Sequence, residues 1–285
     1  MTSTRTIQAS KRRTPRTLGL SAMWRHRRTL RVLVQRDLAV KYQKTVMGYF
    51  WSLIEPLGMA AIYWFVFGLI YAREGDLPEG VTFGLYIVAG MFAWMWANQA
   101  MSESATSLTS QASLITTMRV PRELFPVARV IARFAEFLAG LPVLIGFAIF
   151  GGGQFGWNLL VLPVAVLLQA VLLTGFAFIL ASVNVLYRDV QRFMRLAMRI
   201  LFYATPVIYP IGKIMDLDKL PDLAKTIYHL NPLVGVIELH HYAWIADDRY
   251  FSLTFVLINA ATAIAVLFFG RWLFHKLEPN VLKEL

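Results

Sequence analysis

Acidic and histidine side chains occur at several places where they could do chemistry. Asp216 and Asp218 have the spacing of the metal-binding aspartates of nucleotide-sugar glycosyltransferases, and His240 and His241 are two adjacent potential metal ligands. The sequence Glu-Leu-His-His is not the HExxH pattern of zinc enzymes, and the chain has no cysteine to complete a zinc site. We therefore interpret the aspartates, together with Asp247-Asp248, as loop acids and the histidines as a polar interfacial turn.

A phosphate-binding loop of the GxxxxGK(S/T) type does not occur in the chain. Gly212-Lys213 is followed by Ile214, and no glycine stands five residues before Gly212. The chain also has no serine nucleophile elbow. We expect that it binds no cofactor itself, and that any ATP and Mg²⁺ it depends on are bound by a partner subunit.

Glu55 and Glu136 are the acids that fall within predicted membrane spans. An enzyme acting on polyprenyl carriers needs ionisable groups that converge in or near the membrane, and these two are its candidates. For Glu136, a place at a dimer interface is an equal alternative.

Four arginines form a regular stripe after the fourth apolar segment. Arg188, Arg192, Arg195 and Arg199 are spaced by four, three and four residues, which places them on one face of a helix. The stripe is open to two interpretations: a phosphate-binding surface, or ordinary anchors on the cytoplasmic side.

Aromatic side chains crowd the first apolar segment. Those at its ends, such as Tyr49 and Tyr71, suit the interfacial aromatic belt of a membrane protein. Tyr63, Trp64 and Phe67 lie nearer its middle, where a belt does not need them. Rings at that depth could line a path and stack on the apolar faces of sugars.

The elements that position these residues are predicted to be membrane helices. Only 16% of the residues are charged, against about 25% in a soluble domain. Segments free of Asp, Glu, Lys and Arg are long enough to span a bilayer. We predict an all-α integral membrane protein with about six transmembrane helices, at 50–71, 83–102, 127–149, 159–186, 196–211 and 251–274.

The basic residues are distributed unevenly between the two predicted sides. With a cytoplasmic N-terminus, 23 Lys and Arg fall on the inner side and 5 on the outer side, whereas acids divide evenly. This is the positive-inside pattern, and it predicts that both termini are cytoplasmic. The net charge of +11 is thus assigned to lipid headgroups rather than to nucleic acid.

Three of the segments outside the predicted spans have an expected structure of their own. Residues 1–17 are expected to be a disordered basic tail, and 18–49 an amphipathic helix at the membrane interface, with a soluble arm as the alternative. Within that helix Asp37 and Lys41 form an i,i+4 pair. Residues 227–246 carry Glu238 in an apolar stretch, which favours a re-entrant or interfacial segment over a seventh span.

Three motifs occur in one order along the chain: RDLAVKYQKTVMGYFWSLIEPL, SLITTMRVPRELFP and LYRDVQRFMRLAMRILFYATPVIYP. With them, the chain resembles the permease subunit of polysaccharide ABC exporters of the ABC-2 type, the group that exports O-antigen, teichoic acid, capsule and galactan. The resemblance implies six spans, short re-entrant gate helices at about 211–248 on the outer side, and 50–285 as the transmembrane domain. It also implies a homodimer in the bacterial plasma (inner) membrane that carries two copies of a nucleotide-binding ATPase.

The same resemblance assigns roles to residues, position by position. A coupling helix at about 109–120 would dock into the ATPase, with Ser113, Leu114, Ile115, Met118 and Arg119. A polyprenyl-pyrophosphate headgroup would be recruited by Arg36, Lys41 and Lys44. The sugar path would be flanked by Tyr63, Trp64, Phe67, Phe202, Tyr203 and Tyr209. The segment TTMRV has fewer basic residues and no aromatic residue where relatives often carry them before Pro-Arg.

The implied function is therefore the transmembrane subunit of an ATP-driven exporter of a lipid-linked polysaccharide, not an enzyme. Two alternatives stay open: an ABC-2 exporter of a drug or small lipid, and a membrane enzyme acting on polyprenyl carriers.

Overall fold

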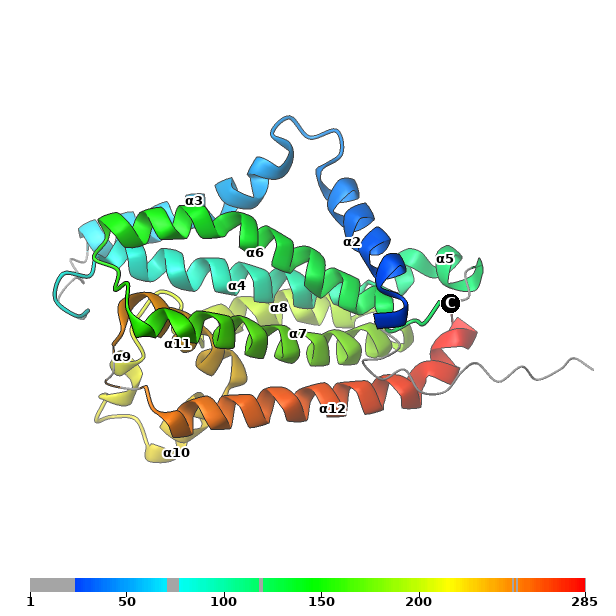
Figure 1. Ribbon diagram of the computed structural model, residues 1–285. Helices are drawn as coiled ribbons and strands as arrows, with labels where there is room; N and C mark the ends of the chain where they lie inside the picture. The colour runs from blue at the N-terminus through cyan, green and yellow to red at the C-terminus, as the bar shows by residue number, and fades with distance from the viewer. Residues whose placement is uncertain (1–23, 71–76, 118–119, 248, 250, 285) are drawn as a thin grey trace, which may run out of the picture.

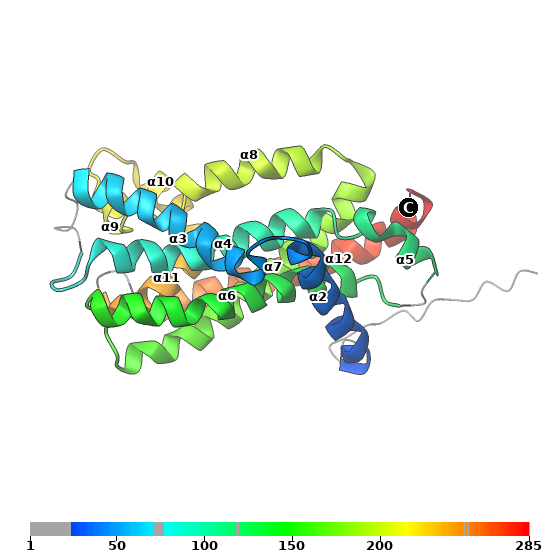
Figure 2. The ribbon, with the colours of Figure 1, turned by 90° about the horizontal axis from the view of Figure 1, so that it is seen from above.

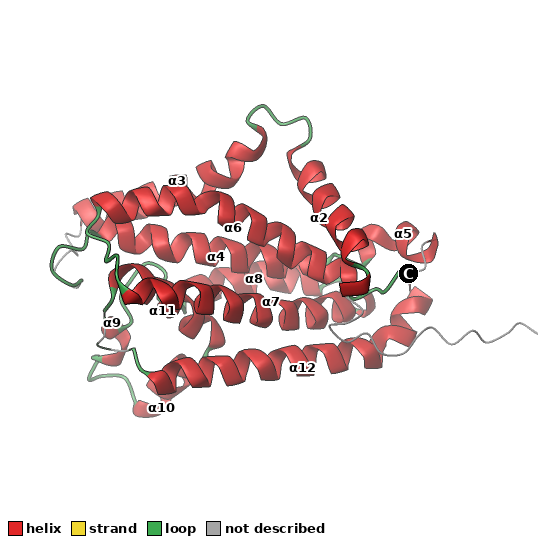
Figure 3. Cartoon of the chain, in the orientation of Figure 1, coloured by secondary structure: helices red, strands yellow, loops and turns green. Residues whose placement is uncertain are grey.

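The computed structural model describes residues 24–70, 77–117, 120–247, 249 and 251–284. Within these ranges every regular element is a helix, which confirms the predicted all-α class (Figure 3). In chain order the elements are α2 (Arg27–Tyr42), η1 (Gly48–Phe50), α3 (Trp51–Tyr63), the π-helix η2 (Trp64–Ile70), α4 (Phe83–Ala105), η4 (Thr109–Gln111), α5 (Ala112–Thr117), α6 (Leu124–Phe150), η5 (Trp157–Leu160), α7 (Val161–Leu186), α8 (Val190–Tyr203), α9 (Gly212–Met215), α10 (Asp222–Leu230), α11 (Pro232–Ile245) and α12 (Leu253–Glu284).

The long helices run roughly side by side and define two ends of a bundle (Figure 1). One end, here called the α5 end, holds α5, the start of α2 and the last turns of α12. The opposite end, the α9 end, holds α9 and α10, together with the turn between α6 and α7. Seen from above, α8 runs along one edge of the bundle (Figure 2).

Helix α4 is the centre of the bundle. It packs against α3, α6, α7, α8 and α11, and its side chains are buried on nearly every face. A helix that is apolar all round is stable only when other helices or lipid surround it. The other long helices are therefore arranged around α4.

Among the residues that the structure describes, three helices are long and apolar enough to cross a membrane: Leu124–Phe150, Trp157–Leu186 and Leu253–Val281. They agree with the third, fourth and sixth predicted spans. The first predicted span is occupied by α3 followed by η2, and the second by α4.

The prediction of a fifth helix at 196–211 is wrong. Helix α8 begins earlier, at Val190, and ends at Tyr203, after which the chain passes through turns to α9. Two prolines account for the early end of α8, because Pro206 and Pro210 each lack a backbone N–H and disfavour helical backbone at the residue before them.

The N-terminal segment is also divided differently from the prediction of one helix over 18–49. Helix α2 ends at Tyr42, and a turn with positive φ at Lys44 (61°) and Gly48 (51°) separates it from α3. Left-handed backbone of this kind interrupts a helix, so α2 and α3 run in different directions (Figure 1). The predicted tail, residues 1–17, lies outside the described residues.

Two helices, not one, occupy the ambiguous segment near residues 227–246. Asn231 ends α10 and begins α11, where its side-chain oxygen accepts a hydrogen bond from the backbone N–H of Leu233 at 3.1 Å. Proline at the first position of α11 is compatible with a helix start but not with a continuous helix. At 14 residues, α11 is too short to span a bilayer, which needs about 20 residues.

The backbones of helices α7 and α12 approach each other closely at two glycines. A Cβ atom on Gly175 would lie 2.7 Å from backbone atoms of Val266 and Leu267, and one on Gly270 would lie 2.2 Å from the carbonyl oxygen of Gly175. Small residues allow this kind of contact between membrane helices.

We expect Gly175→Ala to destabilise the protein by about 1–3 kcal/mol, because the new methyl group must push two helix backbones apart. Thermal unfolding of the purified protein in detergent would measure the change. The matched control is Gly58→Ala in α3, where a Cβ has no heavy atom within 4 Å and should leave stability unchanged or slightly raised. Equal unfolding temperatures for the Gly175→Ala variant and the wild type would contradict the close-packing interpretation.

Candidate functional site

Aromatic side chains from three helices meet on one side of α4. The Phe202 ring centroid lies 5.5 Å from those of Tyr63 and Trp94 and 5.2 Å from that of Tyr203. The hydroxyl of Tyr209 donates to the backbone oxygen of Tyr203 at 2.7 Å. We call Tyr63, Trp94, Phe202, Tyr203 and Tyr209 the aromatic cluster; four of them are predicted path residues.

The cluster is anchored on one side and open on the other. Phe202 is buried against α4, whereas 59% of Tyr203 is exposed. The hydroxyl of Tyr228, from α10, donates to the Tyr209 hydroxyl at 3.3 Å. The cluster therefore connects the end of α8 with the elements of the α9 end.

Two other predicted path residues are not part of this cluster. Trp64 is one position beyond Tyr63, which turns it to another face of the chain. There it lines an apolar cavity of about 470 Å³ with Gly84 of α4 and with Val143 and Phe147 of α6. The side chain of Phe67 lies outside the described part of the structure.

The arginine stripe of α8 continues toward the cluster. Arg188, Arg192, Arg195 and Arg199 are all exposed, but Arg188 lies in the turn before α8, so the prediction that all four lie on one helix holds for three of them. Arg199 is one helical turn before Tyr203. Met194, Met198 and Phe202 are buried on another face and hold α8 against the bundle. Helix α8 therefore presents a cationic stripe that leads to exposed aromatic rings.

A network of charged side chains joins α2, α4 and α6 near the α5 end. Its members, called here the ionic network, are Asp37, Lys41, Glu103, Arg129, Arg133 and Glu136. The Lys41 ammonium lies 3.1 Å from the Glu136 carboxylate, and Arg133 bridges Glu136 and Glu103, with Nε 3.2 Å from Glu103. Arg129 Nε lies 3.3 Å from Asp37.

Neighbouring polar groups add hydrogen bonds to this network. Tyr42 donates its hydroxyl to Glu136 at 2.5 Å, and Lys41 donates to Gln99 at 2.8 Å. Burial, followed by the Glu136 carboxylate, raises the pKa of Tyr42 well above its ordinary value, so the hydroxyl stays a neutral donor. Buried charges require such partners, because an unpaired one is strongly destabilising.

The network changes the interpretation of Glu136 and Lys41. Glu136 is buried within its own chain, where it forms an internal ion pair and accepts a hydrogen bond from Tyr42. Lys41 is bound to Glu136, whereas Arg36 is partly exposed and Lys44 is exposed. Asp37 and Lys41 both form ion pairs with α6, through Arg129 and Glu136, rather than pairing with each other along α2.

The predicted coupling helix is packed into a hydrophobic cluster at the α5 end, called here the second hydrophobic cluster to separate it from the aromatic cluster. Ile115 of α5 is buried in this cluster with Leu33 of α2, Phe125 of α6 and Phe274 of α12. Ser113 is exposed and Leu114 is half-buried. Met118 and Arg119 lie outside the described residues.

A polar bridge ties the residues after α5 to the last helix. Nε2 of His275 lies 2.7 Å from the Glu123 carboxylate, which accepts a hydrogen bond from Arg271 at 3.3 Å, and Arg122 donates to Glu278 at 2.6 Å. Burial raises the pKa of Glu123, although the two basic neighbours oppose that shift. The segment between α5 and α6 is therefore fixed to α12.

The interpretation of the two histidines as an interfacial turn is wrong. Both lie inside α11 and are buried, His240 with its Nε2 2.7 Å from Gln169 Oε1 and His241 with its Nε2 3.1 Å from the Tyr86 carbonyl oxygen. Gln169 in turn donates to the Ala93 carbonyl oxygen at 2.8 Å. An uncharged glutamine within an apolar segment was the available sequence signal for this contact.

The aspartates of the α9 end lie in turns. Asp216 caps the end of α9 and lines a cavity, while Asp218 is exposed. Hydrogen bonds from Arg249 lower the pKa of Asp247. Among the residues that the structure describes, no three His, Cys, Asp or Glu side chains are placed to hold a metal ion.

We expect Glu136→Gln to lower the free energy of unfolding by about 3 kcal/mol, because Arg133 loses a buried counter-charge. Chemical unfolding in detergent would measure it, with Glu55→Gln on the exposed face of α3 as the control. In the Lys41→Met/Glu136→Gln double variant the loss should be smaller than the sum of the single losses. Additive losses would show that the two residues do not interact.

Comparison with known proteins identifies the family of this chain. Residues 28–243 match the profile of a family described as "ABC-2 type transporter". The O-antigen export system permease protein RfbA of Klebsiella pneumoniae is 28% identical over 249 residues, which cover 84% of this chain and 90% of that protein. The protein of the same name from Myxococcus xanthus is 26% identical over 215 residues, covering 75% and 79%. The polysialic acid transport protein KpsM of Escherichia coli is 22% identical over 261 residues, covering 89% and 95%. The matched region includes α2, the ionic network, α5 and the aromatic cluster, and this chain belongs to the ABC-2 type transporter membrane family.

Proposed function

We propose that this chain is the membrane subunit of an ATP-driven exporter that moves a lipid-linked polysaccharide across the plasma membrane. The observation that carries the proposal is that the relatives reported above are named for O-antigen or polysialic acid, which are both sugar polymers. The aromatic cluster supports it, because aromatic rings offer large apolar faces to sugar rings without fixing a chain by strong hydrogen bonds.

The substrate path is proposed to run between α3 and α8. Tyr63 and Phe202 are in ring contact across these two helices, and the exposed Tyr203 lies beside them. In a homodimer, the exposed faces of α3 and α8 from two copies would enclose the path. The α5 end would then be cytoplasmic, and the α9 end would face outward.

The polyprenyl-pyrophosphate headgroup is proposed to bind the exposed basic groups of the α5 end. Arg36 and Lys44 are available on and after α2, and the arginine stripe of α8 supplies four further cations along the path. Arginine is suited to phosphate because its guanidinium can donate two parallel hydrogen bonds. Lys41 would act indirectly, by holding α2 against Glu136.

Energy is proposed to come from a separate ATPase subunit, two copies of which bind the homodimer at α5. The chain has no phosphate-binding loop of its own. The exposed face of α5 is small and polar, with Ser113, Thr116 and Thr117. Ile115 would anchor α5 to the bundle rather than touch the partner, because it is buried.

We expect Ser113→Trp to abolish or strongly reduce binding of the ATPase, because an indole cannot fit an interface shaped for a small side chain. Co-purification with the ATPase and ATP hydrolysis coupled to the complex would measure the effect. Ser113→Ala keeps the residue small and should bind normally. A Ser113→Trp chain that co-purifies and couples hydrolysis like the wild type would remove α5 from the interface.

We expect Tyr203→Ala to slow glycan export severalfold, because an exposed ring contact contributes about 1 kcal/mol. Appearance of the glycan at the cell surface, in cells that lack the native transporter, would measure the rate. Trp157→Ala removes an exposed ring from η5, before α7, and serves as the control. Normal glycan export by Tyr203→Ala, with loss of resistance to a small compound, would favour a drug or small-lipid exporter.

A further inference from the structure

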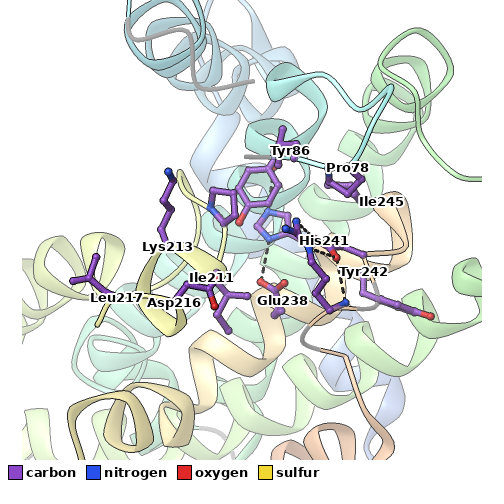
Figure 4. A pocket seen from close by; sticks show the side chains of 15 residues that line it. Pro78, Tyr86, Ile211, Lys213, Asp216, Leu217, Glu238, His241, Tyr242 and Ile245 are labelled. Atoms are coloured by element: carbon purple, nitrogen blue, oxygen red, sulfur yellow. Dashed lines mark hydrogen bonds and ion pairs between the residues drawn. The ribbon is translucent and has the colours of Figure 1, made fainter. Parts of the chain in front are cut away.

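A polar cavity of about 350 Å³ lies at the α9 end (Figure 4). Its wall is formed by Tyr86 of α4, by the turn and short helix around Pro210 to Leu217, and by Glu238, His241 and Tyr242 of α11. Small-molecule sites in proteins commonly have volumes of about 300–1,000 Å³. The cavity is therefore large enough for a ligand of the size of one sugar unit.

The wall of the cavity contains two acceptor atoms that face each other. His241 is 2% exposed, and its Nε2 lies 3.1 Å from the Tyr86 carbonyl oxygen. A carbonyl oxygen only accepts, so Nε2 carries the hydrogen and a neutral imidazole has a lone pair at Nδ1. That atom lies 3.7 Å from Glu238 Oε2, which also can only accept when ionised (Figure 4).

Both atoms are buried, and neither has a hydrogen-bond partner among the residues that the structure describes. Buried polar atoms are almost always hydrogen-bonded, and an unsatisfied one is costly. A second proton on His241 would create an ion pair, but 3.7 Å is too long for a hydrogen bond between the two groups. A ligand with two adjacent donors would satisfy both atoms.

The charges around the cavity favour a neutral ligand. Lys213 and Arg249 are balanced by Asp216, Glu238 and Asp247 on the same lining. An anion would meet the buried Glu238, and a metal ion would meet the ammonium of Lys213. Hydroxyl groups suit both signs, because they donate to carboxylates and accept from ammonium groups.

Tyr86 links the wall of the cavity to the turn that carries Tyr209 of the aromatic cluster. The Tyr86 hydroxyl lies 3.0 Å from the carbonyl oxygen of Pro206 and 2.8 Å from that of Tyr209. The His241 ring stacks on the Tyr86 ring, with centroids 3.9 Å apart. One residue thus joins the turn that carries Tyr209 to the wall of the cavity.

We propose that this cavity is a saccharide-binding subsite, in which two adjacent hydroxyl groups of one pyranose ring donate to Glu238 Oε2 and His241 Nδ1. The inference rests on the proposed function, since a polysaccharide leaving the aromatic cluster would reach this cavity next. The subsite would lie at the outer end of the path and would recognise a pair of adjacent hydroxyl groups.

Saturation-transfer NMR on the full chain in nanodiscs, with free galactose, mannose, glucose and rhamnose as probes, tests the subsite. At least one sugar should bind saturably, and tetrahydropyran-2-methanol, which has a single hydroxyl, should not. Glu238→Gln, which replaces one carboxylate oxygen by an amide donor, should weaken binding by about tenfold or more. Leu217→Trp should block binding by filling the cavity from an exposed position.

Asp218→Asn is the matched control, because Asp218 is an exposed acid near the cavity that does not line it. Thermal unfolding of each variant verifies that it is folded. Lack of saturable binding by all four sugars overturns the proposal, as does binding that both Glu238→Gln and Leu217→Trp leave unchanged.

Glycan export measured on the same variants separates this proposal from the proposed function. A wild-type chain that exports glycan but binds none of the sugars keeps the proposed function and loses the subsite. A wild-type chain that binds the sugars at Glu238 but exports no glycan keeps the saccharide site and loses the proposed function.

Discussion

The pairing of Glu136 with Lys41, Tyr42 and Arg133 is the constraint on which the α5 end depends. A carboxylate that is 9% exposed must be matched by buried donors, and here the donors come from two helices. Because the partners have to meet at hydrogen-bond distance, the angle at which α2 crosses α6 is fixed. Further ion pairs join other residues to this group: Glu103 of α4 pairs with Arg129 and Arg133, and Arg129 also pairs with Asp37 of α2.

Toward the α9 end, buried polar side chains are likewise paired by hydrogen bonds between helices. Gln169, within the apolar helix α7, is hydrogen-bonded to the Ala93 carbonyl oxygen and to His240. Tyr86 contacts the carbonyl oxygens of the turn after α8. These contacts hold α11 and the turn around Pro206 against α4, and so set where the aromatic cluster ends.

Composition and periodicity were sufficient to predict the all-α class and the three most apolar spans, because long uncharged segments can be read directly. The predicted helix boundaries were wrong where a helix-ending residue such as proline lies within an apolar segment. Pro206 and Pro210 ended α8 early, and Asn231-Pro232 divided α10 from α11. The turn after Tyr42 depends on positive φ at Lys44, a residue type that gives no hint of left-handed backbone.

The candidate site was predictable only in part, for a related reason. Tyr63, Phe202, Tyr203 and Tyr209 could be named from their residue types and from the family resemblance, and the structure brings them together. Trp64 belongs to the same aromatic run, yet one residue along a helix turns the side chain by about 100°. Lys41 and Glu136 are 95 positions apart, so no periodicity along the sequence connects them.

The second hydrophobic cluster and the polar bridge of Glu123 together determine how a movement of α5 would spread. Ile115 shares its packing with Leu33 of α2 and Phe274 of α12, and Glu123 binds Arg271 and His275 of α12. Close-packed interiors transmit displacement rather than absorb it. A push on α5 would therefore reach α12 by two contacts, and α2 through Leu33 and through Gln111, whose amide donates to Asp37 at 3.4 Å. Since α2 is paired with α6 by the ionic network, the basic residues on and after α2 would move with the helices around α4, rather than independently of them.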